Sequence, residues 1–192
     1  MGMGVLCSLQ GVPCIYYGTE QGLSGHKDAQ HPDDSMVREA LWGKPNGFDE
    51  SRQLYQALQK ILQVRNEQPA LRYGRQYFRP ISGDGFNFGV SPFPSGVIAF
   101  SRILNDQEVV VVANTNTQQE FTGEVIVDRQ LNAAGSSYQI RFSNKGSARA
   151  NPVFDKPKAS VRITEVGGAV TDGPARSLRV QLQPMEIQIL RQ

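Results

Sequence analysis

GVPCIYYGTEQGLSG, residues 11–25, holds the pattern that decides how the first part of this chain folds. Residues 12–17 form a continuous apolar run, which is typical of a strand buried on both faces in a parallel sheet. Gly18 ends the run, and Glu20 begins a polar, glycine-rich stretch. The sequence therefore predicts a buried strand over residues 12–17, with the carboxylate of Glu20 just beyond its end.

Helices are expected on both sides of this stretch. Residues 3–9 are apolar and are followed by a glycine and a proline, which indicates the end of a helix. A second helix is predicted after residue 50, because apolar side chains and one arginine recur there at helical spacing. They are Leu54, Leu58, Ile61, Leu62 and Arg65. Asp49 and Ser51 are candidate N-caps, and Pro69 is expected to end the helix. Residues 18–50 show little periodicity, and so long a loop in a compact domain is usually functional.

The character of the sequence changes after Gly74. Short β-rich runs follow at residues 77–80, 97–102, 108–113, 124–128, 138–142, 161–165, 178–182 and 186–190. Evenly spaced short strands separated by turn signals predict an antiparallel β-sandwich. We therefore expect a mainly β protein, with a partial βα segment over residues 1–74 and an all-β sandwich over residues 75–192. One parallel-type strand with one helix cannot pair its own backbone, so the first part is expected to need further chain.

Charge and composition narrow the classes of partner. The 192 residues carry 20 Lys and Arg against 18 Asp and Glu, and this net charge of +2 without basic runs does not favour nucleic acid. Residues 1–17 lack a basic n-region and are interrupted early, so we interpret them as folded core and not as a signal peptide or membrane helix. Cys7 and Cys14 fit no metal spacing and are predicted to be buried free thiols. The compartment, cytoplasmic or secreted, stays open.

The opening stretch resembles a motif of the α-amylase family, glycoside hydrolase family 13. Residues 11–20 match G-x-P-x-I-Y-Y-G-x-E, which lies on the last strand of that family's (β/α)8 TIM barrel. The similarity continues through residues 21–22, 37–42 and 62–71. The resemblance implies that residues 1–74 are strand 8, its loop and helix 8 of a catalytic barrel. It also implies that residues 75–192 are the C-terminal sandwich called domain C.

The resemblance implies a sugar-contacting rim on the loop. Active sites of such barrels lie on the loops that follow the strands, so Glu20, Asp34 and Arg38 are the candidate substrate-binding residues. Asp34 and Arg38 stand four apart, like an Asp-x-x-x-Arg pair that hydrogen-bonds a glucose unit in fungal-type α-amylases. A carboxylate and a guanidinium can hold vicinal hydroxyls by charge-assisted hydrogen bonds. Two structural alternatives stay open: Glu20 as an anchor of the loop, and Asp34 with Arg38 as a salt bridge within it.

Aromatic residues near this rim are interpreted as structural. Tyr16 and Tyr17 are expected in the barrel core or wall, and Trp42 is expected to cover the helix.

No catalytic residue is expected in this chain. Retaining hydrolysis of a glycosidic bond needs an acid and a nucleophile carboxyl group, and the resemblance implies that these lie on the fourth and fifth barrel strands, upstream. The chain alone is therefore expected not to hydrolyse starch. No cofactor or metal is expected, and where relatives bind calcium the resemblance implies upstream ligands. The expected partners are an α-glucan oligosaccharide or polysaccharide, and an upstream barrel half or a second copy of the chain. Nucleic acid and membrane are not expected.

Three alternatives remain for the parent protein. It is a transglycosidase or sucrose-cleaving relative, a non-catalytic heavy chain of an amino-acid transporter, or a stand-alone carbohydrate-binding module. The last requires exposed aromatic platforms on the sandwich, and the aromatics of the predicted strands do not stand out as such a row.

Overall fold

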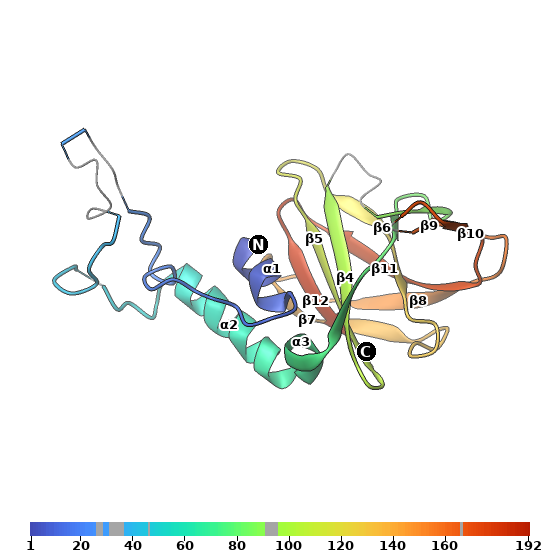
Figure 1. Ribbon diagram of the computed structural model, residues 1–192, viewed down its shortest axis with the longest axis horizontal. Helices are drawn as coiled ribbons and strands as arrows, with labels where there is room; N and C mark the ends of the chain where they lie inside the picture. Colours follow the sequence, from blue (N-terminus) through green and yellow to red (C-terminus); the bar gives the residue numbers. More distant parts are fainter. Residues whose placement is uncertain (26–28, 31–36, 46, 91–95, 166) are drawn as a thin grey trace.

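The computed structural model describes residues 1–25, 29–30, 37–45, 47–90, 96–165 and 167–192. The protein is mainly β, as predicted, with helices on one side of the strands (Figure 1). The helices are α1 Gly2–Ser8, α2 Gln53–Glu67 and α3 Pro69–Tyr73. The strands are β1 Arg75–Phe78, β2 Ile81–Ser82, β3 Asn87–Phe88, β4 Val97–Leu104, β5 Gln107–Asn114, β6 Phe121–Val127, β7 Ser137–Ser143, β8 Ala150–Lys156, β9 Arg162–Thr164, β10 Val170–Thr171, β11 Ala175–Leu182 and β12 Ile187–Arg191.

A nine-stranded antiparallel sheet forms the sandwich. Its order is β1-β4-β5-β12-β7-β8-β11-β6-β2, and a smaller sheet, β10-β9-β3, lies beside it. Side chains from both halves of the large sheet meet in one apolar core, so the halves face one another. The predicted antiparallel sandwich is thus confirmed.

The segment of residues 75–82 joins the two ends of this sheet. Through β1 it pairs with β4, and through β2 it pairs with β6. Between the two strands the Arg79 N–H donates to the Ala99 carbonyl at 2.9 Å, and the Pro80 carbonyl accepts from the Ile126 N–H at 2.9 Å. One short stretch of chain therefore supplies both edges, which leaves less of the sheet edge open to other chains.

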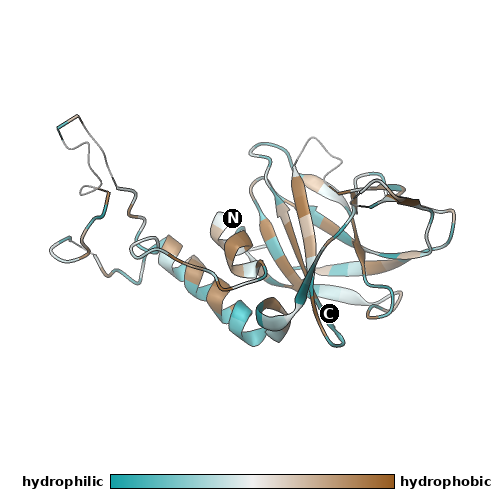
Figure 2. Ribbon diagram, viewed as in Figure 1, coloured by the Kyte–Doolittle hydropathy of each residue, from teal (hydrophilic) through white to brown (hydrophobic). Residues whose placement is uncertain are grey.

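The three helices cover the outer face of the half-sheet that contains β4, β5, β12 and β7. Leu58, Ile61 and Val64 of α2 share an apolar cluster with Cys7 of α1 and with residues of these strands. Figure 2 shows the alternation along α2 of apolar and polar segments that an amphipathic helix requires.

Strand β5 is buried on both faces because it lies between the two cores. Val110 and Val112 belong to the sandwich core, while Val109 and Val111 belong to the cluster under the helices. Successive side chains of a strand point to opposite faces. The valine run of β5 therefore contributes side chains to the sandwich core and to the helix-covered cluster at the same time.

The predicted strand at residues 12–17 is wrong. None of the strands in the described ranges includes these residues, and Val12 is 94% exposed. A parallel strand needs a neighbour to complete its ladder, and the described chain offers none at this place. For the same reason Cys14 is exposed, against the prediction, whereas Cys7 is buried as expected.

Other boundaries also differ from expectation. Helix α2 does end just before Pro69, as expected, but Pro69 also begins α3, because proline is well tolerated in the first turn of a helix. The N-cap of α2 is Arg52; the Asp49 carboxylate instead accepts from the Ser51 N–H and hydroxyl, at 2.9 and 2.6 Å. These bonds lower the pKa of Asp49. Strand β8 was not predicted, since its sequence ANPVFDK mixes proline and charge into the alternation.

None of the helices in the described ranges is long and apolar enough to cross a bilayer.

A tight turn after β2 is organised by Asp84. One carboxylate oxygen accepts from the Ser82 hydroxyl and from the Phe86 and Asn87 N–H groups, each at 2.8 Å, and the other accepts from the Asn87 side chain at 2.9 Å. These bonds, the Asn87 side chain first, hold the pKa of Asp84 far below its ordinary value. The charged form therefore stabilises the folded state.

This turn predicts a pH-dependent stability. A carboxyl group with a depressed folded pKa contributes stability above its unfolded pKa of about 3.9, and that contribution is lost as the pH falls through the folded value. We expect Asp84→Ala to be less stable than the native chain at pH 7, with the difference shrinking below pH of about 4. Urea unfolding at several pH values measures it. Asp106→Ala, at an exposed turn, is the control; a difference for Asp84→Ala that is constant with pH would contradict the role of the charge.

Candidate functional site

Gln21 fastens the described part of the loop to the start of α2. It is 3% exposed, and its side-chain oxygen accepts from the Asp49 N–H at 3.1 Å. Its backbone carbonyl accepts from Arg52 Nη1 at 2.7 Å. Sequence reasoning missed this anchor, although an amide that can both donate and accept is well suited to hold a loop backbone.

Glu39 holds the two arms of the loop together. One carboxylate oxygen accepts from the Gly25 N–H at 2.8 Å, and the other is paired with Lys44. Gly25 has a φ of +64°, and a Cβ there would lie 2.9 Å from the Cα of Val37. The close approach of the arms therefore requires glycine at position 25.

Two of the three predicted site residues, Glu20 and Arg38, lie in the described part of the loop. Arg38 is exposed and lies close enough to Tyr17 to act on it electrostatically. The pKa of Tyr17 is raised, mainly by its hydrogen bond with Tyr16, and the positive charge of Arg38 partly opposes this rise. Glu20 is half-buried near the first turn of α2: the pKa of Tyr55 is raised mainly by Glu50, with a smaller effect from Glu20. No hydrogen bond or ion pair joins Glu20 to Arg38 within the described ranges. Asp34 lies outside the described residues.

The aromatic residues of this region face solvent. Tyr16 and Tyr17 are 58% and 45% exposed, with ring centroids 4.6 Å apart. Trp42 is 83% exposed and meets the ring of Phe48 edge-on at 5.5 Å. The prediction that Trp42 covers the helix is wrong, because its neighbour is another loop residue. The two tyrosines are not core residues of the chain as described.

Two carboxylates of the loop form hydrogen bonds or ion pairs with other residues of the loop. Glu39 bonds Gly25 and Lys44, and Asp49 bonds Ser51. Among the residues that the structure describes, no group of three or more His, Cys, Asp or Glu side chains is placed to hold a metal ion.

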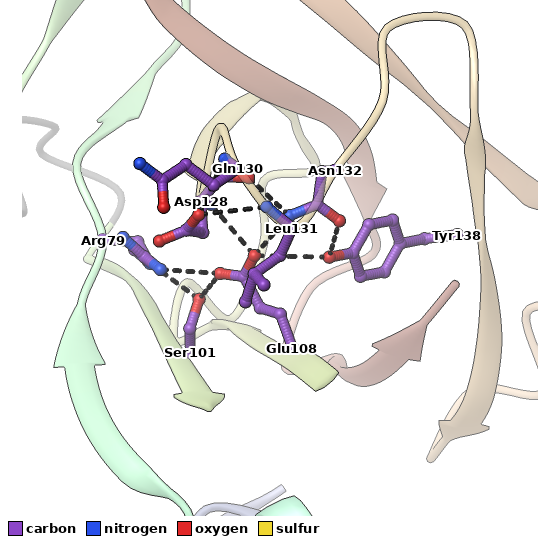
Figure 3. Close-up of polar contacts among 8 residues, drawn as sticks. All are labelled: Arg79, Ser101, Glu108, Asp128, Gln130, Leu131, Asn132 and Tyr138. Atoms are coloured by element: carbon purple, nitrogen blue, oxygen red, sulfur yellow. Dashed lines mark hydrogen bonds and ion pairs between the residues drawn. The ribbon is translucent and has the colours of Figure 1, made fainter. Parts of the chain in front are cut away.

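A second polar centre lies inside the sandwich and was not predicted. In this Glu108 cluster, Glu108 is 4% exposed; one of its oxygens accepts from Arg79 Nη2 at 2.7 Å and from the Ser101 hydroxyl (Figure 3). Its other oxygen accepts from the Asp128 N–H at 2.9 Å and from Asn132 Nδ2 at 2.5 Å. Every lone pair of this buried carboxylate thus faces a donor.

Tyr138 completes the cluster. Its hydroxyl donates to Asn132 Oδ1 at 2.6 Å, and burial followed by the nearby Glu108 raises its pKa well above the ordinary value. The cluster connects β4, β5, β7, the segment between β1 and β2, and the turn after β6 (Figure 3). Its donors and acceptors are matched to one another, so its arrangement is that of a structural tie.

Comparisons with known proteins identify the relatives of this chain. No family model matches it. A cyclomaltodextrin glucanotransferase of Geobacillus stearothermophilus is 30% identical over 122 residues, covering 64% of this chain and 14% of its own length. An α-amylase of Niallia circulans is 27% identical over 172 residues, covering 90% of this chain and 28% of its own. A solved cyclomaltodextrin glucanotransferase with three domains, CldA, has a TM-score of 0.63 at 20% identity, covering 98% of this chain and 31% of its own.

These matches confirm the resemblance inferred from residues 11–20. The chain is similar in sequence to cyclomaltodextrin glucanotransferases and α-amylases of glycoside hydrolase family 13, and its fold is that of a part of such proteins. It spans less than a third of the length of each relative named above.

Proposed function

We propose that the chain is the C-terminal part of an enzyme that acts on α-glucans such as starch and maltooligosaccharides. Residues 1–74 complete a (β/α)8 barrel, and residues 75–192 form domain C. Similarity to enzymes named α-amylase and cyclomaltodextrin glucanotransferase supports the substrate class. The chain covers only 14% and 28% of the length of these two relatives, which supports the proposal that it is a portion of a longer protein.

The carrying observation is that apolar side chains of residues 12–17 and of α2 are exposed in the described chain. Val12, Tyr16 and Tyr17 are 94%, 58% and 45% exposed, and Leu54 of α2 is 40% exposed. The opposite face of α2 is packed on the sheet. Exposed apolar surface of this kind marks an interaction site. The proposed occupant is the rest of the barrel, whose neighbouring strand would also pair residues 12–17.

Residues of the loop are proposed to hold sugar. Arg38 is exposed, and its guanidinium presents several donors in one plane, a geometry suited to neighbouring hydroxyls. Asp34 is its proposed partner, and Glu20 is proposed to lie at the rim. The indole of Trp42, 83% exposed, offers a flat face for a pyranose ring.

The bond-breaking groups are proposed to lie elsewhere in the parent. A retaining mechanism needs two carboxyl groups about 5 Å apart, one as acid and one as nucleophile. In the described loop, Glu39 and Asp49 already bond loop residues. The chain alone is therefore expected to release no reducing sugar from soluble starch, and hydrolysis by this chain that Glu20→Gln abolishes would contradict the proposal.

The positive test uses the longer reading frame that contains this chain. In that protein Arg38→Ala is expected to lower kcat/KM on maltooligosaccharides by about tenfold or more, because one charged hydrogen bond contributes about 1.5–3 kcal/mol. Arg141→Ala, an exposed arginine on β7, is the matched control and should leave kcat/KM unchanged. Equal activity of the Arg38 and Arg141 variants would overturn the assignment of Arg38.

The same assay separates hydrolase from transglycosidase. The similarity to cyclomaltodextrin glucanotransferases favours a transferase as the second candidate. Cyclic products from starch would support that candidate, and linear products with new reducing ends would support the hydrolase.

A further inference from the structure

Helix α2 holds the segment of residues 11–21 at both of its ends. Near the end of the helix, Arg65 Nη2 donates to the Gly11 carbonyl at 2.7 Å. At its start, Nη1 of the N-cap residue Arg52 donates to the Gln21 carbonyl at 2.7 Å. Figure 1 shows this stretch of chain running beside α2 toward the loop. The two arginines therefore form a clamp, the α2 clamp, on one segment.

The length of the segment fits the clamp. At about 1.5 Å per residue, the helix places Arg52 and Arg65 about 20 Å apart along its axis. Ten fully extended residues could reach about 35 Å, so the segment has more chain than this span requires. A turn takes up the excess: the Thr19 N–H donates to the Tyr16 carbonyl at 3.1 Å, and the Gly22 N–H donates to the Thr19 carbonyl at 3.0 Å. The segment thus reaches both arginines without being stretched.

Between its two ends the segment is supported on one side and open on the other. Ile15 is half-buried and packs against the apolar cluster that contains Leu58 of α2. The side chains of Val12, Tyr16 and Tyr17 are exposed. The segment is therefore fixed against the helix, while its other side is free to meet a neighbouring strand or a ligand.

The hydrogen-bond donors of Arg65 explain why an arginine stands at this position. Arg65 is 8% exposed, and none of the ion pairs between described residues includes it. The charged group beside it, Arg102, is a second cation. A buried guanidinium without a carboxylate partner is costly, and an apolar side chain of similar volume avoids that cost. The contribution of Arg65 is therefore its bonds to the carbonyls of Cys7, Leu71 and Gly11.

The clamped segment carries two side chains to the loop. Glu20 directly precedes Gln21, whose carbonyl Arg52 binds, so a shift of the segment would move the Glu20 carboxylate. Tyr17 lies close enough to Arg38 for an electrostatic effect. The position of the segment therefore sets where these side chains lie relative to the rest of the loop.

We propose that Arg52 and Arg65 are positioning residues, which hold residues 11–21 along α2 and thereby place Tyr17 and Glu20 for sugar binding. The clamp rests on its own hydrogen bonds, whereas its effect on sugar binding rests on the proposed function. Neither arginine contacts the sugar; each acts through the backbone of the segment that it binds.

Kinetics of the longer reading frame test the effect on the sugar site. Arg65→Met removes every donor of the side chain and keeps an apolar stem. We expect it to raise KM for maltooligosaccharides about threefold or more and to change kcat by less than about twofold, because substrate and transition state both lose the displaced Glu20. Arg102→Met is the matched control. It also loses a buried guanidinium beside α1, but that guanidinium binds Ser8 and Gly74 and not the clamped segment, so KM should stay native.

The KM value separates positioning from a merely structural role. Partial unfolding lowers the concentration of active enzyme, which lowers the apparent kcat and leaves KM unchanged. Arg52→Met tests the other end of the clamp without a buried site, since the Arg52 side chain is 42% exposed. We expect it to raise KM about twofold, less than Arg65→Met, because Gln21 keeps its bond with Asp49. Lys60→Met, exposed on α2, is its control and should leave KM native.

Limited digestion by chymotrypsin tests the clamp in the full chain without any activity. Cleavage after Tyr17 requires local opening of the clamped segment. Trp42 lies on the loop outside that segment, so cleavage after it is the internal reference. We expect the ratio of cleavage after Tyr17 to cleavage after Trp42 to rise about fivefold or more in Arg65→Met and to stay native in Arg102→Met.

The two experiments judge the clamp and the proposed function separately. A native cleavage ratio in Arg65→Met, or an equal rise in Arg65→Met and Arg102→Met, would overturn the clamp. A raised ratio with a native KM would overturn its role in sugar binding. A longer protein that leaves α-glucans unchanged would contradict the proposed function, and the digestion would still decide whether the clamp holds the segment.

Discussion

Arg102→Ala is expected to lower the free energy of unfolding by about 3–5 kcal/mol, because it leaves two buried carbonyls without a donor and opens a cavity. Arg102 is fully buried in the structure. Its Nη1 donates to the Ser8 carbonyl at 2.8 Å, and its Nη2 donates to the Gly74 carbonyl at 2.8 Å. One side chain of β4 thereby ties the end of α1 to the end of α3.

Arg65, a second arginine close to Arg102, also binds the end of α1. Its guanidinium donates to the carbonyls of Cys7, Leu71 and Gly11 at 2.7, 2.9 and 2.7 Å. Two cations at the carboxyl end of α1 suit the partial negative charge of a helix end. Burial, and then Arg65, lower the pKa of Arg102, but a guanidinium stays protonated in proteins.

Urea unfolding followed by far-UV circular dichroism measures the effect, since the lone tryptophan lies on the loop and does not report on the core. Arg102→Lys should fall between the native chain and Arg102→Ala, because an ammonium group lacks the planar fork that reaches both carbonyls. The exposed Arg141→Ala is the control and should change stability by less than about 0.5 kcal/mol. Similar losses for the Arg141 and Arg102 variants would contradict this account of the tie.

Glu108→Ala is expected to cost about 3–5 kcal/mol, because it removes the carboxylate that is paired with the largely buried guanidinium of Arg79. The Arg79 side chain is 14% exposed and that of Glu108 is 1% exposed. The substitution also leaves the Asp128 N–H and Asn132 Nδ2 without their acceptor.

Glu108→Gln gives a sharper version of the test. Both oxygens of Glu108 accept hydrogen bonds, so either orientation of a glutamine amide places an NH₂ group against a donor. A clear loss of stability is therefore expected even though the volume is kept. Glu120→Ala, exposed in the described chain, is the control. Native-like stability of Glu108→Gln would show that the charge and its acceptors are not what holds the cluster.

The sandwich could be predicted from the sequence because local pattern and tertiary packing agree there. The valine run of β5 is long and β-branched, and the structure buries it between two cores. Residues 12–17 have an equally apolar pattern but form no strand, since pairing depends on a neighbour that the pattern does not encode. Strand β8 was missed because its own composition is not typical of a strand. It is a strand because it pairs with β7 on one side and with β11 on the other.

The candidate site was harder to predict, because the residues that shape it are bonded to partners far away in the sequence. The resemblance singled out Glu20, Asp34 and Arg38, but Gln21 and Glu39 are the residues that shape the described loop. Their partners lie 28 and 14 residues away along the chain, beyond the reach of local patterns. The Glu108 cluster was missed for the same reason, because it joins residues from several strands.

The most direct test of the central claim is the DNA sequence immediately upstream of the codon for Met1. The proposed function predicts an in-frame (β/α)8 barrel with an Asp at the end of its fourth strand and a Glu at the end of its fifth. A membrane helix followed by a barrel without those acids would contradict the enzyme and indicate a transporter subunit. A promoter and an in-frame stop codon would also contradict it and would leave a binding or vestigial protein in place of an enzyme.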